Sequence, residues 1–241
     1  MDCQYDEEMR LHRIFFILVT AMAMSVSAQE SKDSANTTAL SAARFFGTFE
    51  VTSNYMNEAI SQTNNSFAVQ PTLGYVWPHA QIGIFTSNVQ YPDNGESLNV
   101  RPFAWYMFVF GSGVELKAQY NLDMYFASNQ RNGNIFRLDM NVHGQHGIIE
   151  QNANWYGTGQ SGYWLAYQRS WQIPWSLEYK LEAGYLLSNA STYTSYFGVQ
   201  TGLGYKYQDF NYELLTNFNS NAGQFAGTAA MAFWLTLTTK F

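Results

Sequence analysis

The sequence predicts an all-β protein: a transmembrane antiparallel up-and-down β-barrel of about twelve strands. Aromatic residues make up 17% of the 241 residues, whereas charged residues make up only 12%. Over long stretches apolar and polar residues alternate, which is the period of an extended strand with two different faces. The mean hydropathy of -0.24 does not fit a bundle of membrane helices, which needs several runs of about 18 or more apolar residues.

One apolar segment stands near the N-terminus. Residues 14–28, IFFILVTAMAMSVSA, follow Arg10 and Arg13 and end in small residues. This pattern predicts a secretory signal peptide over residues 1–28. An anchoring helix is the alternative interpretation, and Met9 is an alternative start because acidic residues precede it. Residues 29–43 are predicted to form a flexible polar leader, and residues 44–241 a single barrel domain.

Cysteine and charge exclude several classes of function. The single cysteine, Cys3, lies in the predicted signal peptide and would be removed with it. The remaining chain therefore has no disulfide, no thiolate nucleophile and no cysteine metal site. It is mildly acidic, with scattered Lys and Arg, so we expect no nucleic-acid partner.

The clearest alternation covers residues 114–125, VELKAQYNLDMY, where every second residue from Val114 to Met124 is apolar and the intervening residues are polar. Most predicted strands can supply the roughly 9–11 residues that a tilted strand needs to cross a bilayer. Pro71 and Pro102 fall inside strands, so we expect bulges or strand ends there. In order, the predicted strands are residues 45–54, 67–76, 80–89, 98–109, 114–125, 134–143, 147–156, 163–172, 175–187, 193–206, 210–218 and 226–241.

Tight and long connections alternate between these strands. Tight turns are expected near Pro78, Ser112, Gln145, Pro174 and Gln208, and the loops between them are richer in Gly, Asn and Ser. A soluble sandwich is the alternative, but long amphipathic strands with this layout favour a barrel, because lipid tolerates no unpaired edge. An even strand number places both ends of the barrel at the periplasmic, short-turn side.

Aromatic residues cluster at the strand ends, which predicts two girdles at the membrane interfaces. On the turn side these are Trp77, Trp171, Trp175, Tyr205 and Phe210. On the loop side they are Tyr55, Tyr91, Tyr156 and Tyr193.

Residues 51–89 resemble the TorF-type porin family of bacterial outer membranes. The resemblance rests on TSNY at residues 52–55, ISQTNNSFAVQPTLGY at residues 60–75 and GIFTSNV at residues 83–89. It implies an outer-membrane barrel and a channel, without a substrate. Family members commonly carry an aromatic residue, Arg and Gly before Ile-Ser-Gln, where this chain has Asn57, Glu58 and Ala59, and Glu58 reverses the local charge.

The inward faces carry charges of both signs, which predicts a narrow hydrated lumen for passive diffusion of small polar solutes. A non-conducting structural or adhesion barrel is the alternative. The candidates for narrowing the lumen are Phe103, Trp105, Trp164 and Trp234. The pore-lining candidates are Arg101, Glu115, Lys117, Asp123, Arg137, Asp139, Glu150, Glu178, Lys180, Glu182, Lys206 and Glu213.

Nothing in the sequence predicts an enzyme, a cofactor or a metal site. His79, His143 and His146 all fall at predicted periplasmic turns, whereas barrel hydrolases generally need a His near the outer rim. The pair in HGQH supplies only two metal ligands. Ser161 lies in GTGQSG without the strand-turn-helix context of a nucleophile elbow.

The C-terminus, MAFWLTLTTKF, predicts the closing strand and an assembly signal. Phe233, Leu235, Leu237 and Phe241 share the lipid face, with Trp234 and Lys240 on the inward face. We expect the barrel-assembly machinery and periplasmic chaperones to recognise this end. The expected location is the outer membrane of a Gram-negative bacterium, in contact with its lipid and lipopolysaccharide.

Overall fold

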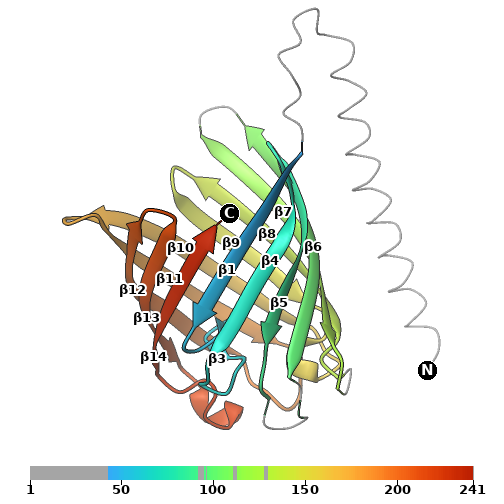
Figure 1. Ribbon diagram of the computed structural model, residues 1–241. Coiled ribbons are helices and arrows are strands. Elements are labelled where there is room, and N and C mark those ends of the chain that lie inside the picture. The colour runs from blue at the N-terminus through green and yellow to red at the C-terminus, as the bar shows by residue number, and fades with distance from the viewer. Residues whose placement is uncertain (1–42, 92–94, 96, 111–112, 128–129, 241) are drawn as a thin grey trace, which may run out of the picture. The chain divides into compact units, whose positions relative to one another are not determined.

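The computed structural model describes residues 43–241 apart from 92–94, 96, 111–112, 128–129 and 241 (Figure 1). The predicted signal peptide and all of the leader but its last residue lie outside the described residues, as do Ser112 and Phe241. The predicted fold class is confirmed, because twelve strands close into one antiparallel barrel. The barrel strands are β1 (Arg44–Thr52), β4 (Ala68–Trp77), β5 (Ala80–Asn88), β6 (Leu98–Phe110), β7 (Val114–Tyr125), β8 (Gly133–Val142), β9 (Gln145–Asn152), β10 (Gly162–Ile173), β11 (Leu177–Ser188), β12 (Tyr196–Tyr207), β13 (Phe210–Asn219) and β14 (Phe233–Lys240).

The barrel closes where its first strand meets its last. β1 pairs with β4 on one side and with β14 on the other, with Thr48 opposite Lys240 and Thr52 opposite Thr236. Within β14, Phe233 and Leu235 are 69% and 56% exposed, whereas Trp234 is only 4% exposed. The two faces of this strand therefore alternate as its sequence predicts.

The outward face of the barrel is an apolar belt. Side chains such as Ile84, Leu214 and Phe218 are about half exposed, whereas a soluble protein would bury most side chains of this kind. The belt is what a barrel presents to lipid tails. Among the residues that the structure describes, no helix is long and apolar enough to cross a membrane.

The two ends of the barrel differ. Figure 1 shows the start of β1 and the end of β14 at the same end, together with the short turns. The opposite end carries the longer loops, the small hairpin of β2 (Met56–Asn57) and β3 (Ile60–Ser61), and the 3-10 helices η1 (Trp155–Gly157) and η2 (Ala222–Phe225).

Three details of the strand prediction are wrong. Pro71 and Pro102 both lie within strands, without a shift of register, although the β4–β5 ladder does end beside Pro71, at Thr72. The β6–β7 ladder instead skips the pairs at Arg101 and Pro102, because proline has no N–H to donate, and then resumes in the same frame. At the loop end, η1 replaces the predicted end of the strand over residues 147–156, and residues 226–232, the predicted start of the last strand, form turns and irregular chain before β14 begins.

Candidate functional site: the lumen and its mouth

Ion pairs join neighbouring strands across the inner wall on the β6–β9 side. Arg101 on β6 binds Asp123 on β7 through two nitrogens, one of them Nη2 at 3.0 Å from Oδ2. Lys117 lies opposite Asp139 at 3.8 Å, and Arg137 on β8 lies 3.3 Å from Glu150 on β9. Adjacent strands thus neutralise each other's charges, and the wall is polar without being strongly positive or negative here.

The opposite wall carries more carboxylates than cations. Lys180 on β11 lies 2.6 Å from Glu213 on β13 and 3.5 Å from Glu178. Glu182 accepts a hydrogen bond from Trp164 Nε1 at 3.3 Å, and Glu50 accepts one from the Thr238 hydroxyl at 3.2 Å. These last two carboxylates have neutral donors, which gives this side of the lumen an acidic character.

A cavity remains inside the barrel beside this acidic wall. Its volume is about 150 Å³, measured as the space open to the centre of a water molecule, which is enough for several waters. Glu50, Gln70, Gln200 and Glu213 line it together with Trp234. The barrel interior is therefore hollow and polar rather than filled by an apolar core.

The other residues proposed from sequence are distributed along the wall. Glu115 accepts a hydrogen bond from Asn141 at 2.9 Å, and Lys206 is exposed near the short-turn end. Trp105 donates to Gln81 at 3.1 Å, and Phe103 packs against the bare Cα of Gly83. That any of these lines or narrows a conducting path stays a prediction.

The two remaining aromatic candidates lie at different depths. Trp234 borders the cavity, whereas Trp164 packs among the loops at the barrel mouth. The histidines lie at the turn end, where His146 Nδ1 is 2.9 Å from Asp139 Oδ1. Ser161 lies in the loop before β10, where its carbonyl accepts a hydrogen bond from the Asn189 N–H.

The loop end of the barrel is closed by packing. We call the buried apolar group there the mouth cluster: Ile60, Trp155, Trp164, Leu186, Tyr196, Phe225 and Ala229. Each of these side chains is at most 3% exposed. They come from the barrel wall and from three different loops, so tertiary contacts alone bring them together.

Loop 1, residues 53–67 between β1 and β4, lies across this mouth. Its β2–β3 hairpin turns at Glu58 and Ala59, which both have positive φ, as a two-residue hairpin turn requires. Main-chain hydrogen bonds tie it to two other loops, from Ser61 N–H to Thr228 O at 2.7 Å and from Gln90 N–H to Gln62 O at 2.9 Å. Loop 1 supplies Ile60 to the mouth cluster.

Glu58 is buried at the centre of this closure. Its carboxylate accepts a hydrogen bond from Trp155 Nε1 at 2.9 Å, and its main-chain oxygen accepts one from the Tyr196 hydroxyl at 2.6 Å. Burial, followed by repulsion from Glu150, raises the pKa of Glu58 to about 8. Near neutral pH this carboxyl therefore remains largely protonated.

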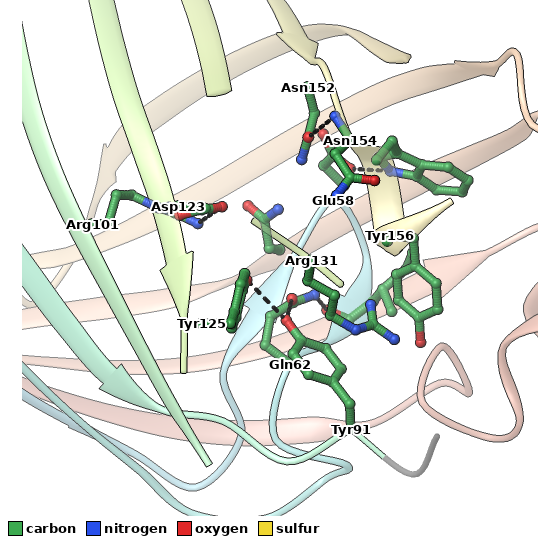
Figure 2. A pocket seen from close by; sticks show the side chains of 14 residues that line it. Glu58, Gln62, Tyr91, Arg101, Asp123, Tyr125, Arg131, Asn152, Asn154 and Tyr156 are labelled. Atoms are coloured by element: carbon green, nitrogen blue, oxygen red, sulfur yellow. Dashed lines mark hydrogen bonds and ion pairs between the residues drawn. The ribbon is translucent and has the colours of Figure 1, made fainter. Parts of the chain in front are cut away.

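A narrow gap remains between loop 1 and the β6–β9 side of the wall. Figure 2 shows it bordered by Gln62, Tyr91, Arg101 and Asp123, with the Arg131 guanidinium over two tyrosine rings. The guanidinium carbon is 3.7 Å from the ring centre of Tyr91. The gap offers only about 30 Å³ to the centre of a water molecule, so water fits and a solute does not.

The loop-side girdle prediction is wrong. Tyr91 is 3% exposed, and Tyr156 and Tyr193 pack on the mouth cluster instead of facing headgroups. Sequence reasoning also missed Arg131 as a residue of the mouth. An aromatic at a strand end has the same local pattern whether its loop folds outward or inward, so no sequence signal separates the two.

The Arg101–Asp123 pair is expected to stabilise the barrel strongly. Its side chains are only 19% and 7% exposed, so Arg101→Gln would leave a buried carboxylate without its cation and lower the free energy of unfolding by about 3–5 kcal/mol. Lys117→Gln is the matched control, with an expected loss below about 1 kcal/mol, because Lys117 is 32% exposed and 3.8 Å from its partner. Denaturant unfolding in detergent micelles measures both, and equal losses would contradict the expectation.

No protein-family model matches this sequence, and no curated protein matches it either. Solved structures are similar in fold. A KdgM porin matches at a TM-score of 0.51 and 9% identity, over 82% of this chain and 97% of the porin. A KdgM porin in complex with disordered oligogalacturonate matches at 0.47 and 11% identity, over 82% of this chain and 97% of that one. Outer membrane phospholipase A from Escherichia coli matches at a TM-score of 0.38 and 13% identity, over 86% of this chain and 92% of the phospholipase.

These identities bear on the fold alone. The first match shows that the chain has the fold of a bacterial outer-membrane β-barrel like that of the KdgM porin. The other two similarities are too distant to support an argument about function.

Proposed function

We propose that this protein is a narrow outer-membrane channel for passive diffusion of small polar solutes. The observation that carries the proposal is the hollow interior, where a cavity of about 150 Å³ is lined by carboxylates and amides. A barrel that only anchors or stabilises the envelope gains nothing from a polar cavity in its interior. The resemblance of residues 51–89 to the TorF-type porin family also supports this proposal.

The charge of the wall bears on the kind of solute. Arg101, Lys117 and Arg137 are each bound to a carboxylate, while Glu50 and Glu182 have only neutral hydrogen-bond donors. A lumen of this kind favours neutral or positively charged solutes over anions. We propose no individual solute.

Planar-bilayer recording of the refolded mature barrel tests the channel. We expect small, resolvable conductance steps from wild type, because the mouth is nearly closed, and larger steps from a variant with loop 1 shortened. Heat-modifiable gel mobility establishes that each sample is folded. A folded barrel that gives no steps in either form would favour the structural or adhesion barrel, and hydrolysis of labelled lipid would favour an enzyme.

A further inference from the structure

We propose that loop 1 is the gate of this channel and that the buried carboxyl of Glu58, which accepts a hydrogen bond from Trp155, is the latch that holds it shut. The inference rests on the proposed function, because it describes how the proposed channel would be opened and closed. It starts from a segment that closes the mouth without being part of the wall. β2 and β3 pair with each other and with no barrel strand that the structure describes.

Loop 1 can leave the mouth without opening the barrel. Its two ends are adjacent, because Thr52 and Ala68 form the last pair of the β1–β4 ladder. β1 also stays paired with β14 up to Thr52. Ser53, the first residue of loop 1, stays hydrogen-bonded to Leu235 on β14. The movement of the rest of the loop breaks contacts at the mouth, such as those from Ser61 to Thr228 and from Ile60 to the mouth cluster.

The surroundings of Glu58 make those contacts sensitive to protonation. Its side chain is 7% exposed, and the charged groups that act on it from the wall are Glu150 on β9, Glu182 on β11 and Arg101 on β6. Asp123 on β7 and Arg131 from the loop after β7 border the same gap as Glu58. Trp155 and Tyr196 are its hydrogen-bond donors. Two of the three wall charges are negative, so a deprotonated Glu58 is both desolvated and repelled.

The direction of the pH effect follows from proton binding. In the closed mouth the pKa of Glu58 is about 8, against 4.5 for an exposed glutamate, so the closed form holds an extra proton between these values. Closure is then fully favoured below pH 4.5 and weakens as pH rises, until the carboxyl is ionised above pH 8. The ratio of open to closed channels rises by up to about tenfold per pH unit within this window.

Bilayer conductance between pH 5 and pH 9 tests the latch. Wild type is expected to conduct least at pH 5 and to rise until about pH 8. Glu58→Gln cannot ionise but still accepts the Trp155 hydrogen bond, so its conductance should stay at the wild-type pH 5 level throughout. A flat wild-type profile, or a rise in Glu58→Gln equal to that of wild type, would overturn the proposal.

A disulfide tests the movement of loop 1 by itself, even where Glu58→Gln does not fold. Ser61 and Thr228 are joined through their main chains, and the mature chain has no native cysteine. The double variant Ser61→Cys with Thr228→Cys should conduct at pH 8 only after reduction. Equal conductance of the oxidised and reduced forms would show that loop 1 is not the gate. Absence of conductance in every form, including the shortened loop, would refute the channel itself.

Discussion

Replacing loop 1, residues 53–67, by an Asn-Gly turn is expected to raise the single-channel conductance several-fold. The replacement is feasible because Thr52 and Ala68 are directly paired, which is the spacing that a two-residue hairpin turn joins. It removes Ile60 from the mouth cluster and Glu58 from beneath Trp155, so the cavity of about 150 Å³ would open to the outside. Planar-bilayer recording at a single pH measures the effect.

Asn64→Gly is the matched control for this change. Asn64 lies in the same loop, is exposed and has a positive φ that glycine adopts easily. The single-channel conductance of Asn64→Gly should equal that of wild type. If shortening loop 1 left the conductance of a folded barrel unchanged, the narrowest point would lie elsewhere, among the strand residues proposed from sequence.

Gly74→Val is expected to abolish formation of the folded barrel. Gly74 faces the lumen in β4, and a Cβ there would lie 2.1 Å from the carbonyl oxygen of Ile82 and 2.7 Å from the Cα of Gly83. Both are main-chain atoms of β5, so no side-chain rotation relieves the clash. The β4–β5 pairing would have to separate, and a barrel with an open edge is not stable in lipid.

Heat-modifiable protein in outer-membrane fractions measures this loss. Gly147→Val is the control, because Gly147 also lies in a barrel strand, β9, yet a Cβ there meets nothing within 4 Å. It should assemble at the wild-type level. Normal assembly of Gly74→Val would mean that β4 and β5 can separate locally without loss of the barrel.

The alternation of apolar and polar residues along the strands was enough to predict the barrel from the sequence. In β7, the side chains from Val114 to Met124 change face at every residue, and the register places Lys117 opposite Asp139 as complementary charges. Such pairs depend only on neighbouring strands, which are also neighbours in the chain. For this reason the strand order and the closure of the barrel by the last strand were predictable.

The mouth was not predictable in this way. Glu58, Trp155 and Tyr196 meet although they lie in two different loops and a strand, and the hydrogen bond from Trp155 to Glu58 spans 97 residues. Unlike a strand, a loop has no regular alternation of apolar and polar residues that would show which of its side chains point inward. Sequence therefore determined a charged barrel with a closing C-terminal strand, whereas only the tertiary structure decided that loop 1 covers its mouth, because long-range packing rather than local pattern holds it there.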